Sequence, residues 1–183
     1  MEAINKTIRV FAPASSANLG CGFDVMGMAL DGIGDVLRIA ISEGDGLTIR
    51  NASAAELPED IEKNVIPPAV RAFMAAAGKK ACLEIVVEKK IRPGSGIGSS
   101  AASSAAAVFG LNELYGRPFP LPELVPFAME GEKLISGTAH ADNSAPAVMG
   151  GIVLIRGYQP LDMVRLPVPD SFCFSVIHPH IVV

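Results

Sequence analysis

The sequence predicts an α+β domain, in which strands and amphipathic helices share one core. Apolar residues alternate in a strand-like way near both ends of the chain, and apolar residues at helical spacing occupy its middle. With 183 residues, 50% of them hydrophobic, the chain is long enough to bury a substantial core. The sequence contains no internal repeat and no candidate domain boundary. A single domain is therefore expected.

Strands are predicted first along the chain. Residues 7–12 form one expected strand, and residues 35–42 form another because their side chains alternate. Residues 46–50 are a third, short strand, whereas the polar stretch 51–60 contains a proline and is predicted to be a loop.

Helices dominate the prediction further on. Residues 67–77 carry apolar side chains at helical spacing and stop before a glycine, as many helices do. Residues 99–115 and 121–135 are two more predicted helices, the first with an Ala- and Ser-rich half that permits close approach of another backbone or a ligand. The remaining predicted strands are Cys82–Glu88, residues 150–156 and residues 172–177.

A glycine-rich loop joins the strand ending near residue 88 to the helix beginning near Ser99. Residues 93–104 read Pro-Gly-Ser-Gly-Ile-Gly-Ser-Ser-Ala-Ala-Ser-Ser, with glycines at 94, 96 and 98. Such glycines allow positive φ angles and let successive N–H groups face one anion, while the helix directs its positive end to the same place. The segment therefore predicts a polyphosphate-binding loop.

Two familiar nucleotide loops do not fit this segment. A Walker A loop needs a lysine after its last glycine, where this chain has Ser99, and the dinucleotide motif G-x-G-x-x-G has a different spacing. The alternative without a binding function is a flexible Gly/Ser linker. The patterned strand and helix on either side favour the phosphate loop.

Three motifs in order resemble the superfamily of galactokinase, homoserine kinase, mevalonate kinase and phosphomevalonate kinase. They are the loop from Pro93, the stretch Pro-Ala-Ser-Ser-Ala-Asn-Leu-Gly-Cys-Gly-Phe-Asp at 13–24, and His-Ala-Asp-Asn-Ser-Ala-Pro at 140–146 followed by two glycines. The last two motifs narrow the resemblance to homoserine kinases. The resemblance implies a ribosomal protein S5 domain 2-like kinase domain, whose mixed or antiparallel sheet has helices on one side.

The resemblance also implies an activity. It is the ATP-dependent phosphorylation of the hydroxyl of L-homoserine to O-phospho-L-homoserine, a cytoplasmic step on the route to threonine. Family members continue with a ferredoxin-like domain, so residues 1–183 are expected to be an ATP-binding N-terminal domain cut before it. Two alternatives stay open: a mevalonate- or isoprenoid-type kinase, and a nucleotide-binding fragment that is inactive without its second domain.

The composition excludes several classes of binding partner for this chain. A net charge of −4 without a basic run argues against nucleic acid, and no stretch is a signal peptide or long enough to cross a membrane. The three cysteines are widely spaced, so neither a disulfide framework nor a metal knuckle is predicted. The expected partner is a small-molecule substrate, and a homodimer is left open.

Residues that would bind ATP and Mg²⁺ follow from the resemblance. Asn64 is placed near the adenine, with the start of a helix as its alternative role. Ser100 and Glu132 are the expected magnesium ligands; their alternatives are helix capping and a solvated helix face. The predicted ATP-binding residues are Asn64, Pro93, Gly94, Ser95, Gly96, Ile97, Gly98, Ser99, Ser100, Ala101 and Ala102.

Two clusters are predicted to bind the acceptor. By resemblance Asn18 and Asp24 bind the amino acid, although either side chain could instead bond its own loop in an Asx-turn. Asn143 is expected to position the acceptor hydroxyl, and Asp142 to bind the substrate ammonium or act as base, which the sequence leaves undecided. His140 orients the substrate in this interpretation, with a buried structural histidine as the alternative. A metal site at residues 178 and 180 is not predicted, because two histidines alone are weak evidence.

Overall fold

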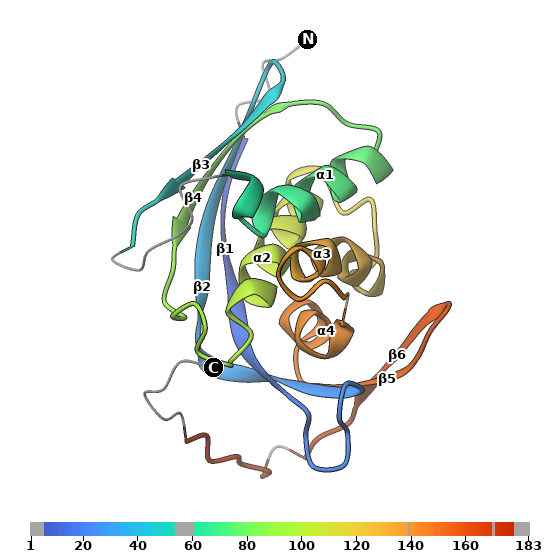
Figure 1. Ribbon diagram of the computed structural model, residues 1–183. Helices are drawn as coiled ribbons and strands as arrows, with labels where there is room; N and C mark the ends of the chain where they lie inside the picture. The colour runs from blue at the N-terminus through green and yellow to red at the C-terminus, as the bar shows by residue number, and fades with distance from the viewer. Residues whose placement is uncertain (1–5, 54–60, 139, 170, 178–183) are drawn as a thin grey trace.

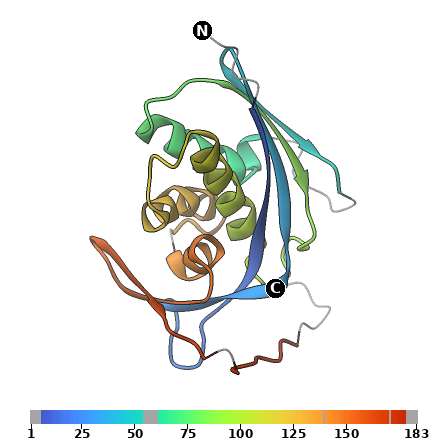
Figure 2. The ribbon, with the colours of Figure 1, turned by 180° about the vertical axis from the view of Figure 1, so that it is seen from behind.

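The computed structural model describes residues 6–53, 61–138, 140–169 and 171–177. In this part of the chain, six strands form one mixed sheet and four α-helices cover one face of it (Figure 1). The view from behind shows the opposite face of the sheet without a helical layer (Figure 2). The predicted α+β class, with helices on one side, is confirmed.

The strands order as β3-β4-β2-β5-β6, and β1 pairs with β2. Only the β3–β4 pair is parallel among the described strands, and the other ladders are antiparallel. The strand bounds are β1 (Lys6–Ala17), β2 (Met26–Ser42), β3 (Gly46–Asn51), β4 (Cys82–Glu88), β5 (Ile152–Tyr158) and β6 (Leu161–Leu166).

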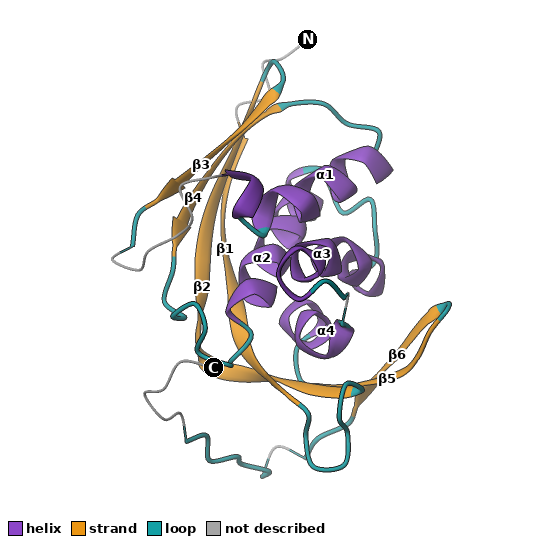
Figure 3. Ribbon diagram, viewed as in Figure 1, coloured by secondary structure: helices purple, strands orange, loops and turns teal. Residues whose placement is uncertain are grey.

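The helices follow the sheet as a second layer (Figure 3). A short 3₁₀ helix, η1, precedes α1, and the parallel strands β3 and β4 are connected through both. The bounds are η1 (Ile61–Lys63), α1 (Ile66–Ala76), α2 (Ser99–Leu114), α3 (Leu121–Ser136) and α4 (Ala141–Met149).

The long strand β2 organises the sheet. Its second half pairs with β4, whereas its first residues, Met26 to Met28, pair with β5. Between these residues, a Cβ atom at Gly27 would lie 1.7 Å from the carbonyl oxygen of Asp142. Only glycine therefore allows β2 to pass this close to α4, which brings the 18–25 loop next to the 140–143 segment.

Small residues let α2 lie at the centre of the helical layer. A Cβ atom at Gly110 would lie 2.6 Å from Cδ1 of Ile39 on the sheet, and one at Gly131 of α3 would lie 2.1 Å from Oγ of Ser104. The Ala- and Ser-rich half of α2 is almost entirely buried. The predicted close approach of another backbone is confirmed, and it places the residue after Gly131 over the first turn of α2.

The core lies between the helices and the covered face of the sheet. Its fully buried large side chains come from all three helices α1 to α3 and from β2, β4 and β5. They include Leu37, Ile39, Phe73, Ile85, Val87, Val108, Leu111, Leu124, Val125 and Val153.

Several predicted elements differ from the structure. Strands β1 and β2 are longer than expected, and neither α4 nor β6 is predicted from the sequence. The strand predicted at 172–177 is wrong: these residues form no ladder, and Phe172 and Ile177 are 55% and 90% exposed. Alternating apolar residues become a strand only beside a partner strand, and the described part of the chain offers none there. Residues 54–60 of the predicted loop, and the histidines at 178 and 180, lie outside the described residues.

Candidate active site

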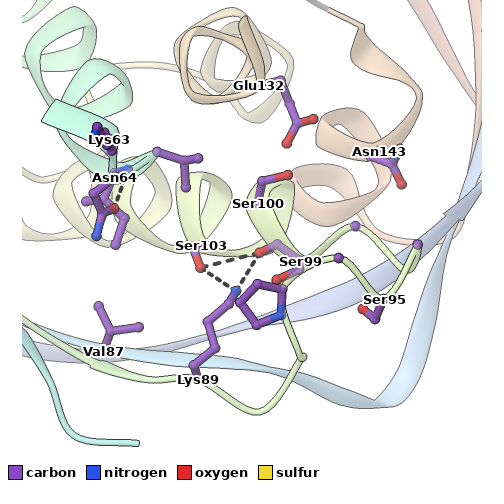
Figure 4. A pocket seen from close by; sticks show the side chains of 16 residues that line it. Lys63, Asn64, Val87, Lys89, Ser95, Ser99, Ser100, Ser103, Glu132 and Asn143 are labelled. Carbon is purple, nitrogen blue, oxygen red and sulfur yellow. Dashed lines mark hydrogen bonds between the residues drawn. The ribbon is translucent and has the colours of Figure 1, made fainter. Parts of the chain in front are cut away.

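A cavity of about 340 Å³ opens between α1, the glycine loop and the first turns of α2, with α3 and α4 closing one side (Figure 4). Its walls combine apolar side chains with main-chain and hydroxyl groups. The lining residues are Lys63, Asn64, Val65, Ile66, Val87, Lys89, Pro93, Gly94, Ser95, Gly96, Gly98, Ser99, Ser100, Ser103, Glu132 and Asn143.

The glycine loop has the backbone that a phosphate cradle requires. Gly94, Gly96 and Gly98 have φ angles of 73°, 74° and 66°, so each adopts the left-handed conformation predicted for it. Gly98 is the N-cap of α2 and supplies no side-chain cap, so the first N–H groups of the helix have no capping side chain. An anion placed over Ser99 and Ser100 would meet these N–H groups and the positive helix end.

The loop is not a flexible linker, because defined hydrogen bonds hold it. The Ser15 N–H donates to the carbonyl of Ile97 at 3.1 Å, which anchors the loop to β1. The Ser95 N–H donates to the carbonyl of Arg92 at 3.2 Å, and the Ser99 hydroxyl donates to the carbonyl of Ile91 at 3.3 Å.

Most of the predicted ATP-binding residues line the cavity. Three of them do not: Ile97 packs partly against the core, and Ala101 and Ala102 are fully buried in α2. The residues that line it are Asn64, Pro93, Gly94, Ser95, Gly96, Gly98, Ser99 and Ser100.

Asn64 combines both roles considered for it. Its Oδ1 accepts a hydrogen bond from the N–H of Ile66 at 3.0 Å, at the start of α1. The side chain also lines the cavity although the residue is only 6% exposed. Because Oδ1 is engaged with the helix, Nδ2 is the group that can meet a ligand.

Glu132 points from α3 toward Ser100 on α2 (Figure 4). Burial raises the pKa of the Glu132 carboxyl, and the Ser100 hydroxyl, which donates a hydrogen bond to it, lowers the pKa in turn. The Asp142 charge also raises this pKa, whereas His140 and Lys89 lower it. The alternative of a solvated helix face fits the neighbours Glu130 and Lys133, whose side chains are 45% and 59% exposed. It does not fit Glu132.

The Ser100–Glu132 pair fits the chemistry of a magnesium site. Both groups offer hard oxygen atoms beside the phosphate loop, and Mg²⁺ commonly takes one or two protein ligands plus phosphate oxygens. The described residues contain no group of three or more His, Cys, Asp or Glu side chains able to hold a metal by themselves.

The 18–25 loop carries the first of the two clusters predicted to bind the acceptor. Asn18 and Asp24 both have left-handed backbones, with φ angles of 60° and 58°, and Asn18 Oδ1 accepts a hydrogen bond from the Asp24 N–H at 2.8 Å. Asn18 therefore bonds its own loop, but through a residue six positions on rather than in an Asx-turn, and this bond closes the loop. The Asp24 carboxylate lies 3.5 Å from Nδ1 of His140.

Tyr158 joins this loop to α4, a contact that the sequence does not reveal. Its hydroxyl donates to the carbonyl of Asp24 at 3.0 Å and accepts from the N–H of Ala141 at 3.3 Å. His140 directly precedes α4 and its side chain is 45% exposed, so the buried structural histidine is wrong.

Asp142 and Asn143 begin α4. Asp142 is only 4% exposed as a residue, and its carboxylate accepts a hydrogen bond from the Asn143 N–H at 3.0 Å. Burial raises the pKa of Asp142, and the nearby His140 opposes that rise. Asn143 Oδ1 accepts a hydrogen bond from the Ser15 hydroxyl at 2.8 Å, and Asn143 itself borders the cavity.

Gly98 is where the two halves of the site meet. A Cβ atom at this position would lie 2.0 Å from Ser15 Oγ and 3.1 Å from Asn143 Oδ1. The last glycine of the phosphate loop thus lies against the amide predicted to position the acceptor, although these residues are far apart in sequence.

Sequence reasoning missed several residues that build the site, although Ser15 and Ser103 lie within the quoted segments 13–24 and 93–104. They contribute through long-range contacts of single side chains. These residues are Ser15, Asp35, Lys89, Ser103 and Tyr158. Asp35 is the one with a detectable signal, since it is a carboxylate at the start of an otherwise apolar strand.

A glycine loop leading into a helix without a capping side chain, with hydroxyl and carboxylate groups beside it, suits the binding of a phosphate-bearing ligand. The sequence pattern described as "GHMP kinases N terminal domain" matches residues 64–151. Residues 64–151 therefore carry the N-terminal domain of the GHMP kinases.

Among the relatives are homoserine kinases. The one from Chlorobium phaeobacteroides is 40% identical over 96% of this chain and 58% of its own length. The one from Natronomonas pharaonis is 49% identical over 81% of this chain and 49% of its own length. The chain therefore spans about half the length of the curated relatives that it matches.

Solved structures agree with this placement. The crystal structure of homoserine kinase from Cytophaga hutchinsonii is 45% identical, with a TM-score of 0.83, over 92% of this chain and 54% of the other. The L. major mevalonate kinase in complex with R-mevalonate has a TM-score of 0.68 at 22% identity, over 89% of this chain and 52% of the other, and shares the fold.

No helix in the described part of the chain is both long enough and apolar enough to cross a bilayer.

Proposed function

We propose that this chain carries the nucleotide site and part of the acceptor site of an ATP-dependent kinase that phosphorylates the hydroxyl of L-homoserine. The observation that carries the proposal is the contact of Asn143 with Ser15 beside Gly98, because it joins the acceptor cluster to the phosphate loop. The homoserine kinases among the relatives support the choice of acceptor.

The nucleotide would lie along the cavity. Its phosphates would accept hydrogen bonds from the N–H groups of the loop and of the first turn of α2. The base would reach the other end, where Val65, Ile66 and Val87 provide apolar walls and Asn64 Nδ2 can donate to a ring nitrogen.

Ser100 and Glu132 would hold Mg²⁺ together with phosphate oxygens. When bound, the ion neutralises charge on the transferring phosphoryl group and orients it. Ser100 already shares a hydrogen bond with Glu132, so the two oxygen groups converge before any ligand arrives.

The acceptor would bind next to this end of the cavity. Asn143 has Oδ1 engaged by Ser15, so its Nδ2 can donate to the homoserine hydroxyl, and the carboxylates of Asp24 and Asp142 suit the substrate ammonium group. The acceptor oxygen forms a bond to the γ-phosphorus while the bond from that phosphorus to the bridging oxygen of ADP breaks.

The hydroxyl proton has two routes out of the reaction. It can pass to a phosphoryl oxygen late in a loose transition state, or to Asp142. Burial raises the pKa of Asp142 toward the range that favours a general base, so both routes are physically open. The product would be O-phospho-L-homoserine, formed in the cytoplasm on the route to threonine.

The decisive experiment measures phosphoryl transfer from ATP with L-homoserine, with mevalonate and with no acceptor. It is done on the 183-residue chain and on the full-length protein. ADP and phosphohomoserine formed only with homoserine would support the proposal. Phosphorylation of mevalonate instead would overturn the acceptor, and acceptor-independent ADP release alone would overturn the transfer.

A further inference from the structure

One buried carboxylate contacts the start of the proposed phosphate loop and connects, through a lysine, to its end. Asp35, on β2, is fully buried, and its Oδ1 accepts hydrogen bonds from the N–H groups of Lys90 and Ile91 at 2.9 and 3.0 Å. These residues directly follow β4, where the loop begins.

Lys89 carries the connection to the other end. Its ammonium group donates to the Ser99 carbonyl at 2.6 Å and to the Ser103 hydroxyl at 2.9 Å (Figure 4). The same group forms an ion pair with Asp35. The Ser103 hydroxyl is itself 3.0 Å from Oδ2 of Asp35. Ser99 is the first residue of α2, where the loop ends.

The ammonium group is committed to the protein in this arrangement. A lysine has three N–H donors, and three oxygen atoms, from Asp35, Ser99 and Ser103, accept from Lys89. The Lys89 side chain is only 3% exposed although the residue lines the cavity. Lys89 therefore differs from the lysine of a Walker A loop, which points its charge at the phosphates.

From this geometry we infer that Asp35 and Lys89 are positioning residues. Together they hold the segment from residue 89 to residue 99, which contains the phosphate loop, in its nucleotide-binding shape. The pair acts before nucleotide arrives, because it closes the loop between its first and last residues. The inference rests on the proposed kinase function, because the loop that the pair holds is the one proposed to bind the nucleotide phosphates.

The clamp gives a reason for burying two charged side chains where apolar side chains could pack instead. Replacing a buried ion pair with apolar groups often leaves stability unchanged or raises it, whereas removing one partner is strongly destabilising. Burial lowers the pKa of Lys89, and the charges of Asp35 and Glu132 oppose that effect. The gain must then lie in the geometry that the pair imposes.

The test uses the full-length protein and separates stability from positioning. In the double variant Asp35→Asn, Lys89→Met no unpaired charge remains, and the amide oxygen can still accept from the main-chain N–H groups. We expect a melting temperature near that of the wild type. We also expect an ATP KM raised about 10-fold, because the charged hydrogen bond to Ser99 is lost, with a homoserine KM within about 2-fold of wild type.

A second readout requires no ligand. In the nucleotide-free double variant, main-chain N–H groups at 91–99 should exchange hydrogen faster than in the wild type. Leu83→Ala is the matched control: it removes a buried side chain at the far end of β4, so it should lower stability without changing the ATP KM or the exchange of the loop.

Ser103→Ala serves as an independent, milder variant that removes one acceptor of Lys89. Should the double variant fail to fold, this variant must still speed the exchange of the loop and raise the ATP KM. Wild-type KM and exchange in either folded variant would overturn the clamp. If the wild-type protein transfers no phosphate, the proposed kinase function fails, while the exchange data on the nucleotide-free proteins still decide the clamp.

Discussion

The Ser15 hydroxyl donates a 2.8 Å hydrogen bond to Asn143 Oδ1, so that β1 fixes the amide of α4 at the edge of the phosphate cradle. No side chain fits at Gly98 beside this pair, because a Cβ atom there would lie 2.0 Å from Ser15 Oγ and 3.1 Å from Asn143 Oδ1. Ser15 of β1 thus holds both the amide proposed to position the acceptor and the proposed phosphate loop. This relationship makes the geometry of transfer sensitive to changes at three separate positions.

Gly98→Ala should abolish nucleotide protection of the loop. The new Cβ would lie 2.0 Å from Ser15 Oγ, and a left-handed alanine adds strain of roughly 1–3 kcal/mol. Hydrogen exchange of residues 93–104, with and without an ATP analogue and Mg²⁺, measures the effect. Gly116→Ala is the control, because Gly116 has a φ of +80° but no atom within 4 Å of its Cβ position. Equal nucleotide protection in the two variants would refute the cradle.

Ser15→Ala should lower kcat about 2- to 10-fold, since it removes one neutral hydrogen bond that holds Asn143. The ATP KM should change little, because the main-chain bond from Ser15 to Ile97 remains. Ser144→Ala, also on α4, is the control: the Ser144 hydroxyl is buried and has no hydrogen-bond partner in the described structure. A steady-state comparison decides the matter, and an unchanged kcat in Ser15→Ala would show that Asn143 needs no such support.

Glu132→Gln should lower turnover sharply, raise the Mg²⁺ requirement and yet stabilise the protein. Burial raises the pKa of Glu132, so the folded state binds a proton more readily than the unfolded state. Its favourable contribution is present below the unfolded pKa and is lost as pH rises through the folded pKa. At neutral pH the amide variant therefore escapes a penalty that the charged carboxylate carries.

Thermal melts across pH 4–8, in the absence of nucleotide and metal, test the stability side of this prediction. The wild type should lose stability relative to Glu132→Gln as pH rises. Parallel curves for the two proteins, together with an unaltered magnesium dependence of turnover, would return Glu132 to a structural role.

Asp142→Asn separates ammonium binding from proton abstraction in the full-length enzyme. If Asp142 binds the homoserine ammonium group, its loss should raise the homoserine KM by about 10- to 150-fold, the cost of a charge-assisted hydrogen bond. We favour this outcome because the substrate hydroxyl already has Asn143. A fall in kcat of roughly 10²–10⁴ at unchanged KM would identify Asp142 as the base instead.

The phosphate loop could be predicted from sequence because its geometry is local. Three glycines between a strand and a helix specify left-handed backbone and an uncapped helix start, whatever packs around them. The motif at 140–146 likewise identified Asp142 and Asn143. It did not identify the helix α4 that carries them, since this helix is short and contains Pro146.

Strand lengths were harder to predict because they depend on the partner strand rather than on local sequence. Pro13 interrupts the pattern of the first strand, yet β1 continues past it, because the proline lies at a register shift of a strand that pairs only with β2. Residues 172–177 show the reverse case, in which a strand-like pattern without a partner stays irregular.

The sequence by itself determined the α+β class and the left-handed glycine loop, and it predicted the residue types of the proposed acceptor cluster, because backbone freedom, periodicity and side-chain chemistry are local properties. Tertiary structure alone decided which side chains meet. Gly131 against Ser104 brings Glu132 over Ser100, and β2 brings Asp35 to Lys89. Such pairs depend on how closely helices and strands approach, and that distance is set by packing across the whole core rather than by any single segment.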